Sequence, residues 1–140
     1  MAATRDVRPP QQIEYEQVVG IARGTWATIS RIRGTRFVMK SHSATNHDFH
    51  EIEKAVYERL GKHPFILPYH GEAVYRFEGM EKKVLVLDYC AKGMLGQEYV
   101  EGRVPPAAQR TKWLSQVVEA LRHPRRPVHA LRPAPNLTPP

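Results

Sequence analysis

The chain has 140 residues, a length that fits one compact domain. Hydrophobic residues make up 41% of it, which allows a core, but no run approaches the roughly 20 apolar residues of a membrane-spanning helix. The polar, proline-containing start lacks the apolar centre of a secretory signal, so we expect a soluble cytoplasmic protein without membrane contact.

The single cysteine, Cys90, excludes an intramolecular disulfide and a cysteine-based metal site, and the sequence assigns no residue to a metal. The formal net charge of +7 is concentrated near the end, in Arg122, Arg125, Arg126 and Arg132. Prolines interrupt these arginines and no aromatic residues lie among them to stack on bases. A solvated basic tail is therefore favoured over a nucleic-acid contact.

The first half of the chain predicts three strands. Residues 1–12, with two adjacent prolines, are expected to form a disordered lead-in. Strand-like runs follow at Ile13–Gly20, Thr28–Arg33 and Thr35–Lys40. The first run ends on a glycine, which is typical of a strand that enters a turn, and Gly34 begins a tight connection between the other two.

Residues 47–60 change to a helical period. Apolar residues recur at spacings of three and four and form the single stripe of an amphipathic helix: Phe49, Ile52, Val56 and Leu60. Thr45, Asn46 and Asp48 offer N-cap oxygens, and Gly61 is a natural end.

Two further strands and a second helix follow. The strands are expected at Ala73–Phe77 and Lys83–Tyr89, and the second is apolar enough to be buried at the centre of a sheet. The helix should begin near Pro106 and end before Pro124, with a Pro/Arg-rich irregular tail over residues 123–140. This order predicts an α+β fold with a mostly antiparallel sheet of about five strands, in one domain over residues 13–122.

Lys40 is the first candidate for chemistry. It ends the apolar run Phe37-Val38-Met39 and could reach phosphates held beneath the preceding glycine-containing turn. A lysine that binds phosphate needs a carboxylate to fix its rotamer, and the following helix offers Glu51 and Glu53. These two point about 200° apart on a helix, so only one can face the sheet.

The order of these features is more specific than any one of them. A glycine turn, a lysine after an apolar triplet, a helical glutamate, the run HPFI and a strand ending in an acidic and an aromatic residue succeed one another. Together they resemble the small lobe of eukaryotic-type protein kinases, and AVYERLGKHPFILPYHGEAV resembles a fungal protein-kinase-like family in particular. The resemblance covers about residues 13–122. It implies a sheet with one packed helix, followed by one or two helices of an incomplete large lobe.

The resemblance assigns roles to individual residues. FVMK takes the place of the V-A-I-K motif, so Lys40 would bind the α- and β-phosphates of ATP. Glu53 would be its helix partner, since its spacing to HPFI fits a loop with one extra residue. The family activity that this implies is ATP-dependent phosphorylation of Ser/Thr hydroxyls on proteins.

The resemblance also implies an adenine pocket. Leu87 would be the gatekeeper, the backbone carbonyl of Asp88 and the backbone of Cys90 would meet the adenine edge, and Val19 and Val38 would form an apolar roof. The alternative is that these are ordinary core-strand residues.

The phosphate loop departs from the family pattern G-x-G-x-x-G-x-V. Gly20 is present, Ala22 stands at the second glycine, and Gly24 serves as the third only after a shift of one residue. A Cβ at Ala22 and the bulk of Trp26 would crowd a nucleotide, so ATP binding is expected to be weak or absent.

The catalytic residues of the family are missing. A kinase needs one aspartate to orient the substrate hydroxyl, and an asparagine and a second aspartate to hold Mg²⁺. His129 and Asn136 lie in a stretch that resembles a damaged copy of the catalytic loop, but no aspartate follows Asp88. We expect a truncated, inactive chain.

Three alternatives remain at this stage. The chain could be a non-catalytic pseudokinase-type module that binds a protein partner, a basic nucleic-acid binder, or a non-functional product of a misassembled reading frame. The proline- and arginine-rich end fits the last of these.

Overall fold

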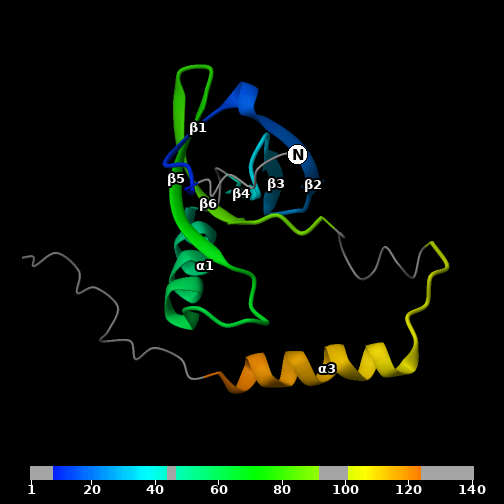
Figure 1. Cartoon of the computed structure of the whole chain (residues 1–140). Helices are drawn as coiled ribbons and strands as arrows, with labels where there is room; N and C mark the ends of the chain where they lie inside the picture. Colours follow the sequence, from blue (N-terminus) through cyan, green and yellow to red (C-terminus); the bar gives the residue numbers. More distant parts are fainter. Residues whose placement is uncertain (1–7, 44–46, 92–100, 124–140) are drawn as a thin grey trace, which may run out of the picture.

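The computed structural model describes residues 8–43, 47–91 and 101–123 and confirms an α+β fold (Figure 1). A curled six-stranded sheet lies beside one helix, and a second helix follows late in the chain. The strands are β1 (Gln12–Glu14), β2 (Val18–Arg23), β3 (Ala27–Ile32), β4 (Phe37–His42), β5 (Tyr69–Phe77) and β6 (Met80–Asp88). The helices are the 3₁₀ turn η1 (Tyr15–Gln17), α1 (His47–Leu60) and α3 (Ala107–Arg122).

The sheet has the strand order β1-β5-β6-β4-β3-β2. Every neighbouring pair is antiparallel except β1 and β5, which are parallel. The prediction of a mostly antiparallel sheet is therefore confirmed, whereas the expected number of about five strands was one too low. β1 has only three residues and begins inside the expected lead-in, where Gln11 C=O accepts a hydrogen bond from Val74 N–H at 2.9 Å.

The strand predicted over residues 13–20 is split in two. The 3₁₀ turn η1 interrupts it, and the side chain of Gln17 caps this turn by accepting a hydrogen bond from Glu14 N–H at 2.7 Å. Gly20 does not end the strand as predicted: it lies within β2 and pairs with Ser30 of β3. The turn comes later, where Gly24 N–H donates to Ala27 C=O at 2.9 Å.

Side chains alternate between the two faces of the sheet, and one face forms the core. The core cluster consists of Ile13, Ile32, Phe37, Met39, Ala73, Val84 and Val86, all nearly inaccessible to solvent. On β4 and β6 the intervening residues, among them Val38, Lys40 and Leu87, point to the opposite face. Helix α1 lies on that second face, since Glu53 contacts Lys40.

The helix predicted over residues 47–60 is confirmed, but its apolar stripe does not cover the sheet. Ile52 and Val56 are 58% and 48% exposed. The side chains that contact the sheet from α1 are mostly polar, and they include His50, Glu53 and Lys54. The seam between α1 and the sheet therefore combines ion pairs and hydrogen bonds with an aromatic contact, the stacked rings of Tyr57 and Tyr69 at 5.1 Å.

Helix α3 also confirms its predicted limits, with Pro106 at its N-cap and its last residue at Arg122. Leu114 and Leu121 on its apolar face are 65% and 70% exposed. The ring of His123, just past its end, hydrogen-bonds Leu60 C=O at 2.9 Å and contacts His63. In the described parts of the chain, no helix is both long and apolar enough to cross a membrane.

The turn between β3 and β4 gives a first prediction. Gly34 has a φ of 72°, which L-residues with a Cβ adopt at a cost, although no atom lies close enough to obstruct a methyl group. We expect Gly34→Ala to lower the free energy of unfolding by about 1 kcal/mol, measured by urea denaturation. Gly20→Ala is the matched control, because Gly20 is equally unobstructed and has no positive φ. An equal loss in both variants would contradict the conformational explanation.

Candidate functional site

The first predicted contact of the site is confirmed: Lys40 Nζ and Glu53 Oε1 lie 2.6 Å apart. Lys40 is near the middle of β4, where the outward face of the strand meets α1, and Glu53 lies on the inward face of the helix. Glu51, the other candidate, is exposed and does not contact Lys40; its carboxylate lies near Glu72 of β5 instead. About a quarter of each side chain in the pair is accessible, so the ammonium group keeps contact with solvent.

His42 is a second partner of Glu53, and no pattern in the sequence indicated it. Its Nε2 lies 2.6 Å from Glu53 Oε2, so each carboxylate oxygen is used by a different residue of β4. Burial by itself raises the pKa of Glu53, but the hydrogen bonds and charges of Lys40 and His42 outweigh burial and leave that pKa below its ordinary value. Glu53 is thus held as a carboxylate that fixes both side chains.

The polar seam continues along α1 to β5. His50 Nε2 lies 2.9 Å from Glu72 Oε1, and Lys54 Nζ lies 3.3 Å from the same oxygen. Burial raises the pKa of Glu72, but the hydrogen bond from His50 and the charge of Lys54 more than offset this and lower it. Lys82 adds a hydrogen bond to His42 C=O, and desolvation lowers its pKa.

The strand register places the predicted roof residues in one row across the sheet. Val19 pairs with Arg31, Arg31 with Val38, and Val38 with Leu87, so these four side chains form one row on the face of α1. Val38 and Leu87 are buried, while Val19 is 41% exposed at the edge. The next row, through Ala22, Ile29 and Lys40, is aligned by a bulge between Gly20 and Ala22. The two rows form a continuous surface from the predicted adenine side to the predicted phosphate side.

Arg31 is a member of this row that the sequence analysis missed. Its guanidinium lies over the ring of Tyr89, 4.5 Å from the ring centre, next to the predicted hinge. A charged side chain between Val19 and Val38 would interrupt the predicted apolar roof. Here the guanidinium of Arg31 lies on Tyr89 instead, and the roof positions are left clear. Only the cross-strand register reveals this position, because Arg31 is far from both valines in the sequence.

The glycine-containing turn between β2 and β3 is short and contacts α1. Gly24 lies at its start, and the ring of Trp26 contacts Phe49 of α1 at 5.2 Å between ring centres. Ser43 N–H donates to Trp26 C=O at 2.8 Å, which ties the turn to the end of β4. The side chain expected to crowd a nucleotide is therefore engaged with the first turn of α1.

Several groups of the predicted hinge already form hydrogen bonds within the chain. Asp88 N–H donates to Pro68 C=O at 3.2 Å, and Tyr89 N–H donates to Arg36 C=O at 2.8 Å. The Asp88 carboxylate binds the ring of His70 at 2.5 Å, a contact that the sequence did not indicate. Cys90 is exposed at the end of this segment. The predicted catalytic-loop remnants His129 and Asn136 lie outside the described residues.

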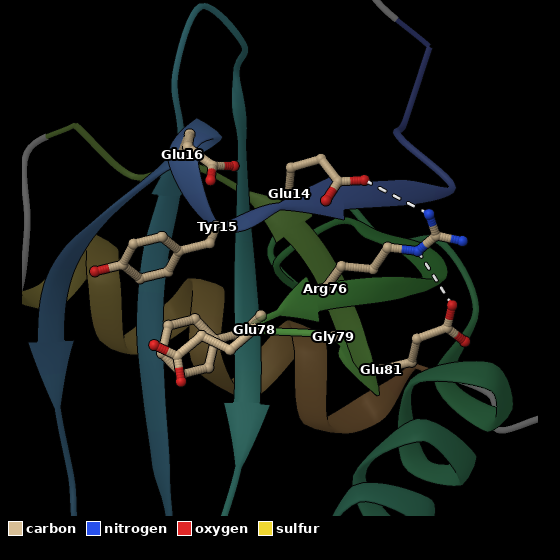
Figure 2. A pocket seen from close by; sticks show the side chains of 8 residues that line it. Glu14, Tyr15, Glu16, Arg76, Glu78, Gly79 and Glu81 are labelled. Atoms are coloured by element: carbon tan, nitrogen blue, oxygen red, sulfur yellow. Dashed lines mark hydrogen bonds and ion pairs between the residues drawn. The ribbon is translucent and has the colours of Figure 1, made fainter.

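A separate hollow at the tip of the β5–β6 hairpin has the wrong charge for phosphate. It has a volume of about 660 Å³, and Figure 2 shows its lining from β1, η1, β5, the hairpin turn and β6. Four of the lining residues are glutamates: Glu14, Glu16, Glu78 and Glu81. The one cation of the lining, Arg76, is already paired with Glu14 and Glu81, so this hollow offers an anion little attraction.

Comparison of the chain with models of protein families and with curated proteins gave no match.

Proposed function

We propose that this chain is a protein-kinase-like small lobe whose β4 and α1 form a surface for the phosphates of ATP. The observation that carries the proposal is the ion pair of Lys40 and Glu53 at 2.6 Å. Protein kinases use a lysine on a strand and a glutamate on the following helix in this way, with the lysine contacting the phosphates. The partly exposed ammonium of Lys40 is free to approach a phosphate oxygen from the solvent side.

The row of Val19, Arg31, Val38 and Leu87 supports the same proposal. With the guanidinium of Arg31 on Tyr89, its three apolar members offer the contact that an adenine ring needs, on the same face as Lys40 and one row away from it. Glu53 and His42 hold the β4 side of this face, so the lysine is oriented before a nucleotide arrives. The family-level reaction would be transfer of the γ-phosphoryl group of ATP to a Ser/Thr hydroxyl.

These 140 residues do not supply that reaction by themselves. They contain no aspartate after Asp88, so they offer neither the base nor the magnesium ligands that phosphoryl transfer requires. The Mg²⁺ of the family therefore finds no assigned ligands here. The role that we propose for this stretch is weak nucleotide binding without catalysis.

Binding of a fluorescent ATP analogue to the purified chain tests the proposal. We expect a dissociation constant in the range of about 0.1–1 mM, and Lys40→Met should weaken it at least about tenfold. Adenosine binding should not change, because Lys40 would contact only phosphates. Lys83→Met, at an exposed lysine of β6, is the control for lost charge. Equal loss in both lysine variants, or no binding of millimolar ATP, would overturn the proposal.

A second candidate function is that of a non-catalytic module that binds a protein. Exposed apolar residues on both helices favour it, notably Ile52, Leu114 and Leu121. The nucleotide experiment separates the two, since an interaction module needs no nucleotide. Failure of ATP to bind, together with a folded far-UV spectrum, would favour this candidate.

A further inference from the structure

The seam between α1 and β5 contains a group of metal-ligating side chains. His50 and Glu51 come from α1, and Glu72 comes from β5. One donor atom from each residue lies within 4.8 Å of the donor atoms of the other two. The bond between His50 Nε2 and Glu72 Oε1 at 2.9 Å shows that two of the three side chains already face one another across the seam.

The histidine of this group is buried with one ring nitrogen unused. His50 is 7% exposed, and its Nδ1 has no hydrogen-bond partner within the described parts of the chain. His42 is 4% exposed with an unused Nδ1 of its own, and the two rings meet edge to face at 5.6 Å. A neutral imidazole that donates from Nε2 to a carboxylate keeps an unprotonated Nδ1, so each ring has a nitrogen lone pair that no described group uses.

This group is accessible from outside. A hollow of about 500 Å³ lies beside it, and its lining includes His42, His50 and Glu51. The rest of that lining includes the apolar Tyr75, Phe77 and Met80 and two lysines, Lys82 and Lys83, whereas Glu72 does not line the hollow. An ion can therefore reach the histidines from solvent without the sheet opening.

We propose that His50, Glu51 and Glu72 form a binding site for a divalent transition-metal ion of the zinc class. An imidazole together with two carboxylates is a ligand set that zinc accepts, with bonds of about 2.0–2.2 Å, whereas Mg²⁺ and Ca²⁺ prefer oxygen ligands alone. Two carboxylates balance the charge of the ion, and water completes a four-coordinate site. None of the three ligands belongs to the proposed nucleotide surface, although His50 contacts His42, which also binds Glu53.

Two features set the expected affinity. Donor atoms up to 4.8 Å apart must draw closer around an ion, since ligands on one zinc ion lie roughly 3.3 Å from each other. Lys54 must also release Glu72, which it now holds at 3.3 Å. Both changes cost binding energy, so we expect a dissociation constant of about 1–10 µM rather than the tighter binding of a structural zinc site.

Binding would fasten α1 to the sheet at a second point. The helix is held to the sheet through polar contacts, and the ion would tie its first turns to β5. Because a ligand that binds only the folded state stabilises it, the melting temperature should rise with zinc concentration.

Isothermal titration of the untagged, metal-free full chain with zinc chloride tests this proposal. We expect one site per chain, a Co²⁺ complex with the absorption bands of four-coordinate cobalt, and no heat with Mg²⁺. Glu72→Gln and Glu51→Gln should each weaken zinc binding at least about tenfold. Glu51 is exposed, so the second variant keeps its fold even if the first loses stability.

His63→Ala is the matched control, since the rings of His63 and His123 form the other histidine pair of the described chain, 4.7 Å apart. This variant should bind zinc as well as the wild type. Loss of binding in His63→Ala with full binding in Glu51→Gln would overturn the proposal, and so would absence of binding at 100 µM zinc, taken as about ten times the weakest affinity expected. Neither result would bear on nucleotide binding, which is read by a separate assay.

Discussion

Replacing Phe37 with alanine should lower the free energy of unfolding by about 3–5 kcal/mol. Phe37 is fully buried in the core cluster and makes an edge contact with the ring of His70 at 4.8 Å. Removing the ring leaves a cavity that neighbouring strands cannot fill, because β4 is paired on both sides. For a domain of this size the loss is a large fraction of the total stability.

Urea denaturation followed by tryptophan fluorescence measures this loss, with Phe65→Ala as the control. Phe65 is 41% exposed on the loop before β5, so its removal should cost less than about 1 kcal/mol. Phe37→Leu keeps most of the volume and should fall between the two. If Phe37→Ala were no more destabilising than Phe65→Ala, the core cluster would be wrongly placed.

Local patterns predicted the elements well where one strong signal dominated. The apolar run from Val84 to Leu87 indicated a buried central strand, and all four residues are buried in β6. The helical period and Gly61 marked the limits of α1, and Pro106 marked the start of α3. Of the predicted N-cap residues, Thr45 and Asn46 lie outside the described residues and Asp48 lies within the first turn of α1. In these cases the signal lies within a few residues and owes little to the rest of the fold.

The same local patterns failed to predict the structure where it is determined by pairing with a strand that is distant in the sequence. Gly20 resembles a turn residue, but pairing with Ser30 keeps it extended. The run predicted from Ile13 covered two of the three residues of β1, but it did not indicate a separate strand, because β1 is defined by its parallel pairing with β5, more than sixty residues away. A short strand of this kind follows from the sheet and cannot be seen in its own sequence.

The residues of the candidate site likewise fall into those that the sequence predicted and those that only the fold reveals. The resemblance to kinases paired Lys40 with Glu53, and the helical angle left only one of two glutamates facing the sheet. His42, Arg31 and Glu72 were missed because each joins the site through strand register or through a contact across the seam. The orientation of α1 was missed for a related reason: a hydrophobic stripe normally faces the core, but here His50, Glu53 and Lys54 face the sheet, and Ile52 and Val56 are exposed.

Replacing Glu53 with glutamine should lower the free energy of unfolding by about 1–2 kcal/mol at pH 7, since one carboxylate serves both Lys40 and His42. The pKa of Glu53 lies below its ordinary value of 4.5 in the folded chain, so the ionised carboxylate adds stability above about pH 4.5. That stability is lost as the pH falls through the folded pKa. The variant has no such group, and its difference from the wild type should vanish at low pH.

Urea denaturation at a series of pH values from 7 downward measures this convergence. Glu58→Gln is the control, because Glu58 is an exposed glutamate on the same helix and should give nearly the wild-type curve. If the loss in the free energy of unfolding of Glu53→Gln stayed constant with pH, packing rather than the charge of Glu53 would stabilise the contact between α1 and the sheet. In that case the Lys40 ammonium would not depend on the carboxylate for its orientation, and the case for a phosphate-positioning pair would lose its physical basis.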